Sequence, residues 1–157
     1  MGKDIHVRLV HKEYETNLWK QVILYYKKNE EIKPVDVYPF RNYELFNILS
    51  EEDDFYHTIP IITNDLPSSL KQEIEEYQKE GGGYKFQEIT LADLELYLYR
   101  MPKVRDWDYE EDDPKAFKDN PVKFFIERII QYLDFAEPYW DLINLHSNVR
   151  ILYWFDN

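Results

Sequence analysis

The end of the chain carries the strongest constraint on its fold. Across residues 149–155 almost every side chain is apolar, with Arg150 as the exception. A short run of this kind predicts a β-strand with two apolar faces. Near the start, Ile5, Val7 and Leu9 alternate with polar residues, which predicts a strand with one buried face. Strands at both ends favour an α+β fold, in which a mostly antiparallel sheet packs against helices.

Two further strands are predicted before residue 40. In residues 18–26 the stretch from Val22 to Tyr26 leaves neither face polar, so this strand is expected to be covered on both sides. Residues 27–34 are charged and are expected to form a loop. Val35–Tyr38 is expected to form a short edge strand that Pro39 ends.

About four helices follow from apolar side chains spaced three and four residues apart. Two of them are predicted at residues 41–49 and 68–79, the second ending at three glycines. Thr90 is typical of an N-cap for a third helix, which Pro102 is expected to end. Residues 102–119 are expected to form an exposed loop. Asn120-Pro121 then marks the start of a fourth helix.

Size and charge narrow the class of protein. The chain has 157 residues and no cysteine, so we expect one domain, residues 1–157, without disulfides or a catalytic thiol. It has no secretory signal pattern and no apolar run of the roughly 18 residues that span a membrane, so we expect a soluble, cytoplasmic protein. The net charge is −12 and is concentrated after residue 50. This charge disfavours direct binding of nucleic acid and favours a partner with a basic surface.

Two acidic runs form the candidate partner-binding site. Aromatic residues accompany both, with Phe55 and Tyr56 after the first run and two more within the second. Carboxylates beside aromatic rings can hold Arg and Lys through ion pairs and cation–π contacts. The candidate partner-binding residues are Glu51, Glu52, Asp53, Asp54, Asp106, Trp107, Asp108, Tyr109, Glu110, Glu111, Asp112 and Asp113.

The same carboxylates have other possible uses. Such runs commonly form a solvated loop that keeps a protein soluble. Spaced carboxylates can also imitate a phosphate backbone and occupy a basic nucleic-acid channel. A calcium loop is disfavoured, because the second run lacks both the Asp-x-Asp-x-Asp-Gly order and a glycine. We predict no cofactor and no dedicated metal site.

The terminal segments offer an alternative site. Asp4 and His6 share one strand face, and His146 and Asp156 flank the closing strand. If the two terminal strands are neighbours, these four residues can meet at one edge of the sheet. Such a set suits a divalent metal or a general acid–base pair, and thus a metal-dependent hydrolase acting on a nucleotide or nucleic acid. The competing interpretation is that these residues cap turns or face water.

Other enzyme motifs are missing from the sequence. It has no nucleophile elbow and no phosphate-binding glycine loop. The only glycine cluster, residues 81–83, follows a helix instead of preceding one. A non-enzymatic protein is therefore the favoured interpretation.

Four short patches, at both ends and in the middle of the chain, form a distinctive set. They are MGKDIH at 1–6, RNYELF at 41–46, Leu66-Pro67 and VRILYWFDN at 149–157. With these patches the chain resembles a family of small uncharacterised proteins carried by bacteriophages and prophages. Members often carry a His-Ser-His-Ser-Trp stretch before a helix, whereas residues 83–87 here contain no histidine. The resemblance implies a shared fold and a phage setting, and no activity.

The sequence thus predicts an acidic phage protein that binds and inhibits or modulates a host protein with a basic surface. The expected partner is a nuclease or another defence component. The expected role is therefore counter-defence of the anti-CRISPR kind. Nucleic-acid mimicry is one way in which the protein would inhibit such a partner.

Overall fold

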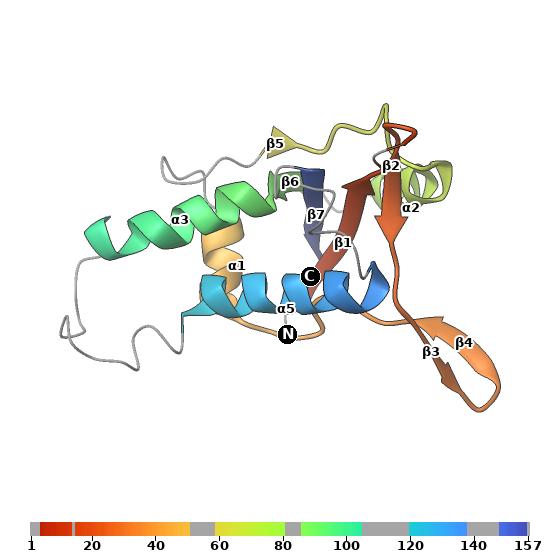
Figure 1. The fold of residues 1–157 in the computed structure, drawn as a ribbon, viewed down its shortest axis with the longest axis horizontal. Helices are drawn as coiled ribbons and strands as arrows, with labels where there is room; N and C mark the ends of the chain where they lie inside the picture. The colour runs from red at the N-terminus through yellow and green to blue at the C-terminus, as the bar shows by residue number, and fades with distance from the viewer. Residues whose placement is uncertain are drawn as a thin grey trace.

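The computed structural model describes residues 4–13, 15–50, 59–80, 86–104, 120–137 and 148–156, and it has the predicted α+β fold (Figure 1). Five strands form one antiparallel sheet in the order β2-β1-β7-β6-β5, and β3 and β4 form a separate hairpin. The strands are β1 (Asp4–Lys12), β2 (Trp19–Val22), β3 (Tyr25–Lys28), β4 (Glu31–Pro34), β5 (Ile59–Pro60), β6 (Gln87–Thr90) and β7 (Val149–Asp156). The helices are α1 (Tyr43–Ser50), α2 (Ser68–Lys79), α3 (Leu91–Val104) and α5 (Pro121–Ala136).

The two terminal strands pair along almost their whole length. β1 and β7 are antiparallel, with Asp4 opposite Asp156 at one end and His11 opposite Val149 at the other. Every residue of β7 from Val149 to Phe155 is buried, which confirms the prediction of two covered apolar faces. β7 lies at the centre of the sheet, between β1 and β6.

Helices cover both faces of the sheet. On one face α1, α3 and α5 pack against the odd-numbered side chains of β7, including Ile151 and Tyr153. On the other face α2 contributes Leu70 and Ile74 to a smaller core around Trp154. Figure 1 shows α2 on the opposite side of the sheet from α5. Because side chains alternate between the faces of a strand, the uninterrupted apolar sequence of β7 supplies both cores.

Side-chain caps set the start of two helices, as predicted. The Thr90 hydroxyl accepts a hydrogen bond from the Asp93 backbone N–H at 3.1 Å. The Asn120 side chain accepts hydrogen bonds from the N–H groups of Val122 and Lys123. α3 continues two residues beyond Pro102, so the predicted end of this helix is wrong. Pro102 lies only two residues before the end of α3. Its missing N–H therefore removes a single hydrogen bond of the helix.

The region between residues 18 and 38 differs most from the prediction. The expected single strand over residues 18–26 is divided into β2 and β3, and Tyr25 and Tyr26 are exposed. The expected loop at 27–34 is instead part of the β3–β4 hairpin, which projects from the rest of the molecule (Figure 1). Its two-residue turn places Asn29 and Glu30 at positive φ, as a type I′ turn requires.

Residues 35–38 form no strand, so the predicted edge strand is wrong. The reason lies in their backbone hydrogen bonds, because their carbonyls accept from side chains of α5. Tyr132 donates to the Val35 carbonyl, and Arg128 donates to the carbonyls of Asp36 and Val37. The carbonyls of Val35, Asp36 and Val37 are therefore directed at α5 and not at a neighbouring strand.

Candidate functional site

The two predicted acidic runs lie outside the described residues. Residues 51–54 and 106–113, and with them every candidate partner-binding side chain named above, fall in stretches that the structure does not describe. The same holds for the glycines at 81–83, for most of the predicted loop at 102–119 and for His146. Their proposed roles stay predictions.

Three of the four residues of the alternative site are brought to one end of the sheet. The pairing of β1 with β7 places Asp4 opposite Asp156, and His6 opposite Trp154. His6 Nε2 donates to Asp156 Oδ2 across the strands at 2.6 Å. The condition on which the alternative site depends, that the two terminal strands are neighbours, is therefore met.

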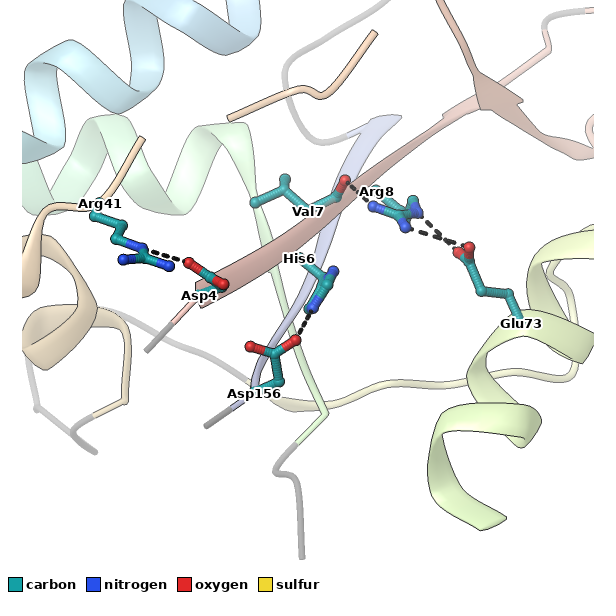
Figure 2. Close-up of polar contacts among 7 residues, drawn as sticks. All are labelled: Asp4, His6, Val7, Arg8, Arg41, Glu73 and Asp156. Carbon is teal, nitrogen blue, oxygen red and sulfur yellow. Dashed lines mark hydrogen bonds and ion pairs between the residues drawn. The ribbon is translucent and has the colours of Figure 1, made fainter. Parts of the chain in front are cut away.

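Asp4 takes no part in the His6–Asp156 pair. Its Oδ1 accepts a hydrogen bond from Arg41 Nε at 2.6 Å, and this bond lowers the pKa of Asp4 below its ordinary value. Figure 2 shows Arg41 on one side of β1 and the His6–Asp156 pair on the other. Among the described residues no three His, Asp or Glu side chains are grouped as a metal site.

Aromatic and charged side chains surround His6 on the face of the sheet that α2 covers. The imidazole stacks on the Trp154 ring at 5.6 Å between centroids and contacts Tyr77 of α2 at 5.2 Å. Arg8 lies two residues after His6, on the same face of β1. Its Nε donates to Glu73 Oε1 at 2.7 Å, and its Nη2 donates to Glu73 Oε2 at 3.2 Å. Through these contacts the polar residues of β1 fasten α2 to the sheet, which is a structural role. A histidine–carboxylate pair can also move a proton, provided that a substrate reaches it.

A buried ion-pair network lies near the other end of β7. Arg150 Nη2 donates to Glu88 Oε2 at 2.6 Å and to the Ile62 carbonyl at 2.7 Å, and Nη1 donates to Asp65 Oδ1 at 2.9 Å. Arg150 and Glu88 are both buried, and the guanidinium lies over the Trp19 ring. The sequence marked Arg150 as the one polar residue of its strand, but nothing in the pattern identified Glu88 as its partner.

His11 lies between two neighbouring strands at one end of the β1–β7 pairing. It lies on β1 between Lys20 of β2 and Val149 of β7, and its Nε2 is buried with no hydrogen-bond partner among the described residues. Burial lowers the pKa of His11, and the charge of Glu137 opposes this effect. The folded protein therefore favours the neutral imidazole more than the unfolded chain does.

We expect His11 to reduce stability as the pH falls. The contribution of the neutral imidazole is present above the ordinary histidine pKa of about 6.5, and it is lost as the pH falls through the lower folded-state pKa. Urea unfolding of the wild type and of His11→Phe between pH 8 and 5 measures this effect. The wild-type free energy of unfolding should fall relative to the variant below about pH 6.5. A difference that is constant over this range would contradict the assignment.

A second candidate site lies on the side of α5 that faces away from the core. Side chains spaced three and four apart line this side, and Phe40 from the segment before α1 adjoins them. Together they surround a shallow hollow of about 600 Å³. We call this surface the α5 outer face, and it consists of Phe40, Phe124, Glu127, Arg128, Ile130, Gln131, Asp134 and Phe135.

The α5 outer face exposes three phenylalanines. Phe135 is 68% exposed, and Phe40 and Phe124 are each nearly half exposed. The rings of Phe40 and Phe124 contact each other edge to face at 5.4 Å, and Tyr38 packs beneath both. Large apolar side chains that gather on a surface, with polar residues around them, are typical of protein interaction sites.

Carboxylates accompany these rings, and the one cation is engaged. Glu127 and Asp134 lie about two turns apart on α5, and both are exposed. Arg128 donates to two backbone carbonyls and lies over the Phe40 ring, with 5.9 Å from Cζ to the ring centroid. Two of the three charged side chains of this surface are negative, and Glu127 also pairs with Lys123 beside it, with 3.9 Å between Nζ and Oε1.

Part of this surface can be predicted from the sequence. The spacing of Glu127, Gln131 and Asp134 by four and three residues predicts that they lie on the exposed side of the helix, and the structure confirms this. Phe124 and Phe135 lie eleven residues apart, or three helical turns, and hence on this same side. That spacing is the signal from which the site could have been found.

No described helix combines the length and the apolar character needed to cross a bilayer. Comparisons of the chain with protein-family models, with curated proteins and with solved structures find no match.

Proposed function

We propose that this protein is a non-enzymatic phage protein that binds a host protein through that protein's basic surface and thereby inhibits or modulates it. The observation that carries the proposal is the α5 outer face, where exposed phenylalanines lie beside carboxylates. This is the same combination of residue types that the sequence predicted for the binding site, at a different place in the chain.

The chemistry of this face selects a cationic partner. Arginine and lysine side chains can stack on Phe124 or Phe135 while their charged groups pair with Glu127 or Asp134. The intramolecular contacts of Arg128 keep its charge directed toward backbone carbonyls. The net charge of −12 adds long-range attraction, which accelerates association with a basic partner and weakens as salt is added.

The proposal extends to the two acidic runs. Residues 51–54 and 106–113 would enlarge the contact with the same basic partner, and their spacing would let the protein compete with nucleic acid for a basic channel. A nuclease or another defence component has such a channel. The phage family that the chain resembles supplies the setting for such counter-defence.

Affinity capture from a bacterial lysate, followed by mass spectrometry, tests the proposal with matched variants. Phe135→Ser removes the most exposed ring of the α5 outer face. Ile32→Ser is the control, because Ile32 is 71% exposed on the β3–β4 hairpin and outside this face. We expect a partner that wild type and Ile32→Ser retain and that Phe135→Ser loses, with at least tenfold weaker binding when the purified partner is titrated. Equal capture by all three proteins would contradict the role of this face.

Charge reversal tests the electrostatic half of the proposal. The double variant Glu127→Lys with Asp134→Lys should weaken binding of the purified partner and reduce its salt dependence. A quadruple change of Asp106, Asp108, Glu110 and Glu111 to lysine tests the second acidic run in the same assay. The partner's own activity, and its competition with DNA or RNA, are then measured with and without the protein. Binding that is insensitive to salt and to both sets of changes would overturn the proposal.

A further inference from the structure

Part of β1 has an open edge. β7 pairs with one side of β1 from Asp4 to His11, but β2 pairs with the other side only from Leu9 to Lys12. Within the described part of the chain, Asp4–Arg8 has no strand on that second side. In an antiparallel pair every second residue directs its N–H and C=O away from its partner, so this stretch presents main-chain groups along one edge that no described strand pairs with. The Val7 carbonyl accepts a hydrogen bond from Arg8 Nη1 at 3.0 Å (Figure 2), and its second lone pair can accept another from a peptide N–H.

The segment that could have closed this edge is held elsewhere. Residues 36–40 run beside Asp4–Arg8, and residues of both stretches line one cavity. As described above, the carbonyls of Val35, Asp36 and Val37 bond to side chains of α5. Val35 N–H donates to the Leu24 carbonyl at 2.7 Å. The segment is thus anchored to α5 at these positions, and it forms a wall that faces β1 without pairing with it.

A groove separates β1 from this wall. One cavity of about 320 Å³ lies between Asp4–Arg8 and residues 36–40, and a second of about 350 Å³ continues toward β2 and α2. The two share Val7, Arg8, Asp36 and Val37, so they adjoin each other along the open edge. We call this groove the β1-edge groove.

We propose that the β1-edge groove binds an extended peptide segment of a partner protein, which adds to the sheet as a strand beside Asp4–Arg8. Addition of a strand to an exposed sheet edge is an established mode of peptide recognition, in which main-chain hydrogen bonds give affinity and alternate side chains give specificity. The sheet then continues past β1 over the five residues where β2 is missing.

The two sides of the groove specify the alternation of that peptide. Val7, Val37 and Tyr132 offer apolar contacts to one set of side chains. Glu73 and the exposed Asp36 offer carboxylates, although Glu73 already holds Arg8. With the negative charge of the whole chain, this lining favours an alternation of apolar and cationic residues. The proposal does not depend on the α5 outer face, and each can fail without the other.

Hydrogen exchange of the free protein is the first test. If the edge is open, the amides of Asp4–Arg8 should alternate, with those bonded to β7 protected and those facing the groove at least tenfold faster. The stretch Leu9–His11 should show no such alternation, because strands flank it on both sides. Uniform protection of Asp4–Arg8 would show that the edge is already covered and would overturn the proposal.

Titration with a synthetic peptide is the second test. The probe is a seven-residue alternation of valine and lysine, added to ¹⁵N-labelled protein and followed by NMR. We expect shift changes at Asp4–Arg8 and residues 35–38, and slowed exchange of the groove-facing amides. Two peptides, N-methylated on the valines or on the lysines, should differ at least tenfold, since only one set of N–H groups faces β1. Equal binding of both peptides would exclude strand addition.

A variant that fills the groove completes the experiment. Asp36 is exposed and lines both cavities, so Asp36→Trp should block the groove and weaken peptide binding at least tenfold. Lys33→Trp, on the exposed hairpin, is the matched control and should bind as the wild type does. Shift changes confined to α5, or binding that Asp36→Trp leaves intact, would overturn the proposal while leaving the proposed function untouched.

Discussion

Replacement of Arg150 by alanine is expected to lower the free energy of unfolding by about 3–5 kcal/mol, the loss typical of breaking a buried ion pair. Arg150 and Glu88 are both buried and lie 2.6 Å apart. Without the guanidinium, Glu88 keeps a desolvated charge, and the Ile62 carbonyl loses a donor. Urea unfolding followed by circular dichroism measures the change.

A double variant separates the charge effect from simple loss of packing. Arg150→Met combined with Glu88→Leu removes both charges and retains volume, so it should recover most of the stability that Arg150→Ala loses. Lys123→Ala is the surface control, because its ion pair with Glu127 is exposed and is expected to be worth about 0.5 kcal/mol. If Arg150→Ala lowers the free energy of unfolding by less than about 1 kcal/mol, Glu88 is not left as a buried, unpaired charge, and the prediction is wrong.

Trp154→Ala is expected to cost about 3–5 kcal/mol, as is typical for a large side chain removed from a core. Trp154 is fully buried and contacts His6, Tyr77 and Phe86. Because these contacts join α2 to the sheet, hydrogen exchange in α2 should accelerate more than exchange in α5. Equal acceleration of the two helices would contradict this division of the core.

The conservative variant Trp154→Phe refines the same prediction. The indole Nε1 of Trp154 is buried and has no hydrogen-bond partner among the described residues. Phenylalanine retains part of the ring volume and removes this unsatisfied donor, so the variant should cost much less than Trp154→Ala. A loss as large as that of the alanine variant would mean that the N–H group is satisfied in solution.

The elements predicted correctly are those for which local sequence decides the structure. β1 and β7 followed from their apolar patterns, and the α3 and α5 starts followed from Thr90 and Asn120, whose side chains bond to nearby backbone. The alternative site requires β1 and β7 to be neighbours. The two strands do pair, and this pairing brings His6 and Asp156 into contact.

The errors arose where distant groups decide. Residues 35–38 have the composition of a strand. Their carbonyls, however, accept hydrogen bonds from Tyr132 and Arg128, which lie almost a hundred residues away in the sequence. The β3–β4 turn uses Asn29-Glu30 and lacks the glycine by which such turns are usually recognised. The β1-edge groove exists because residues 35–38 bond to α5 and do not pair with β1. No pattern within β1 itself could therefore have indicated the groove.

Ribosomes make β7 last among the described elements, yet it lies between β1 and β6. Until residues 149–156 emerge, the nascent chain holds two strands whose shared neighbour has not been synthesised. Joining strands so distant in sequence carries a large loop-closure entropy and slows folding. The sheet can therefore close only after residues 149–156 have been synthesised, and apolar strand edges stay accessible to chaperones until then.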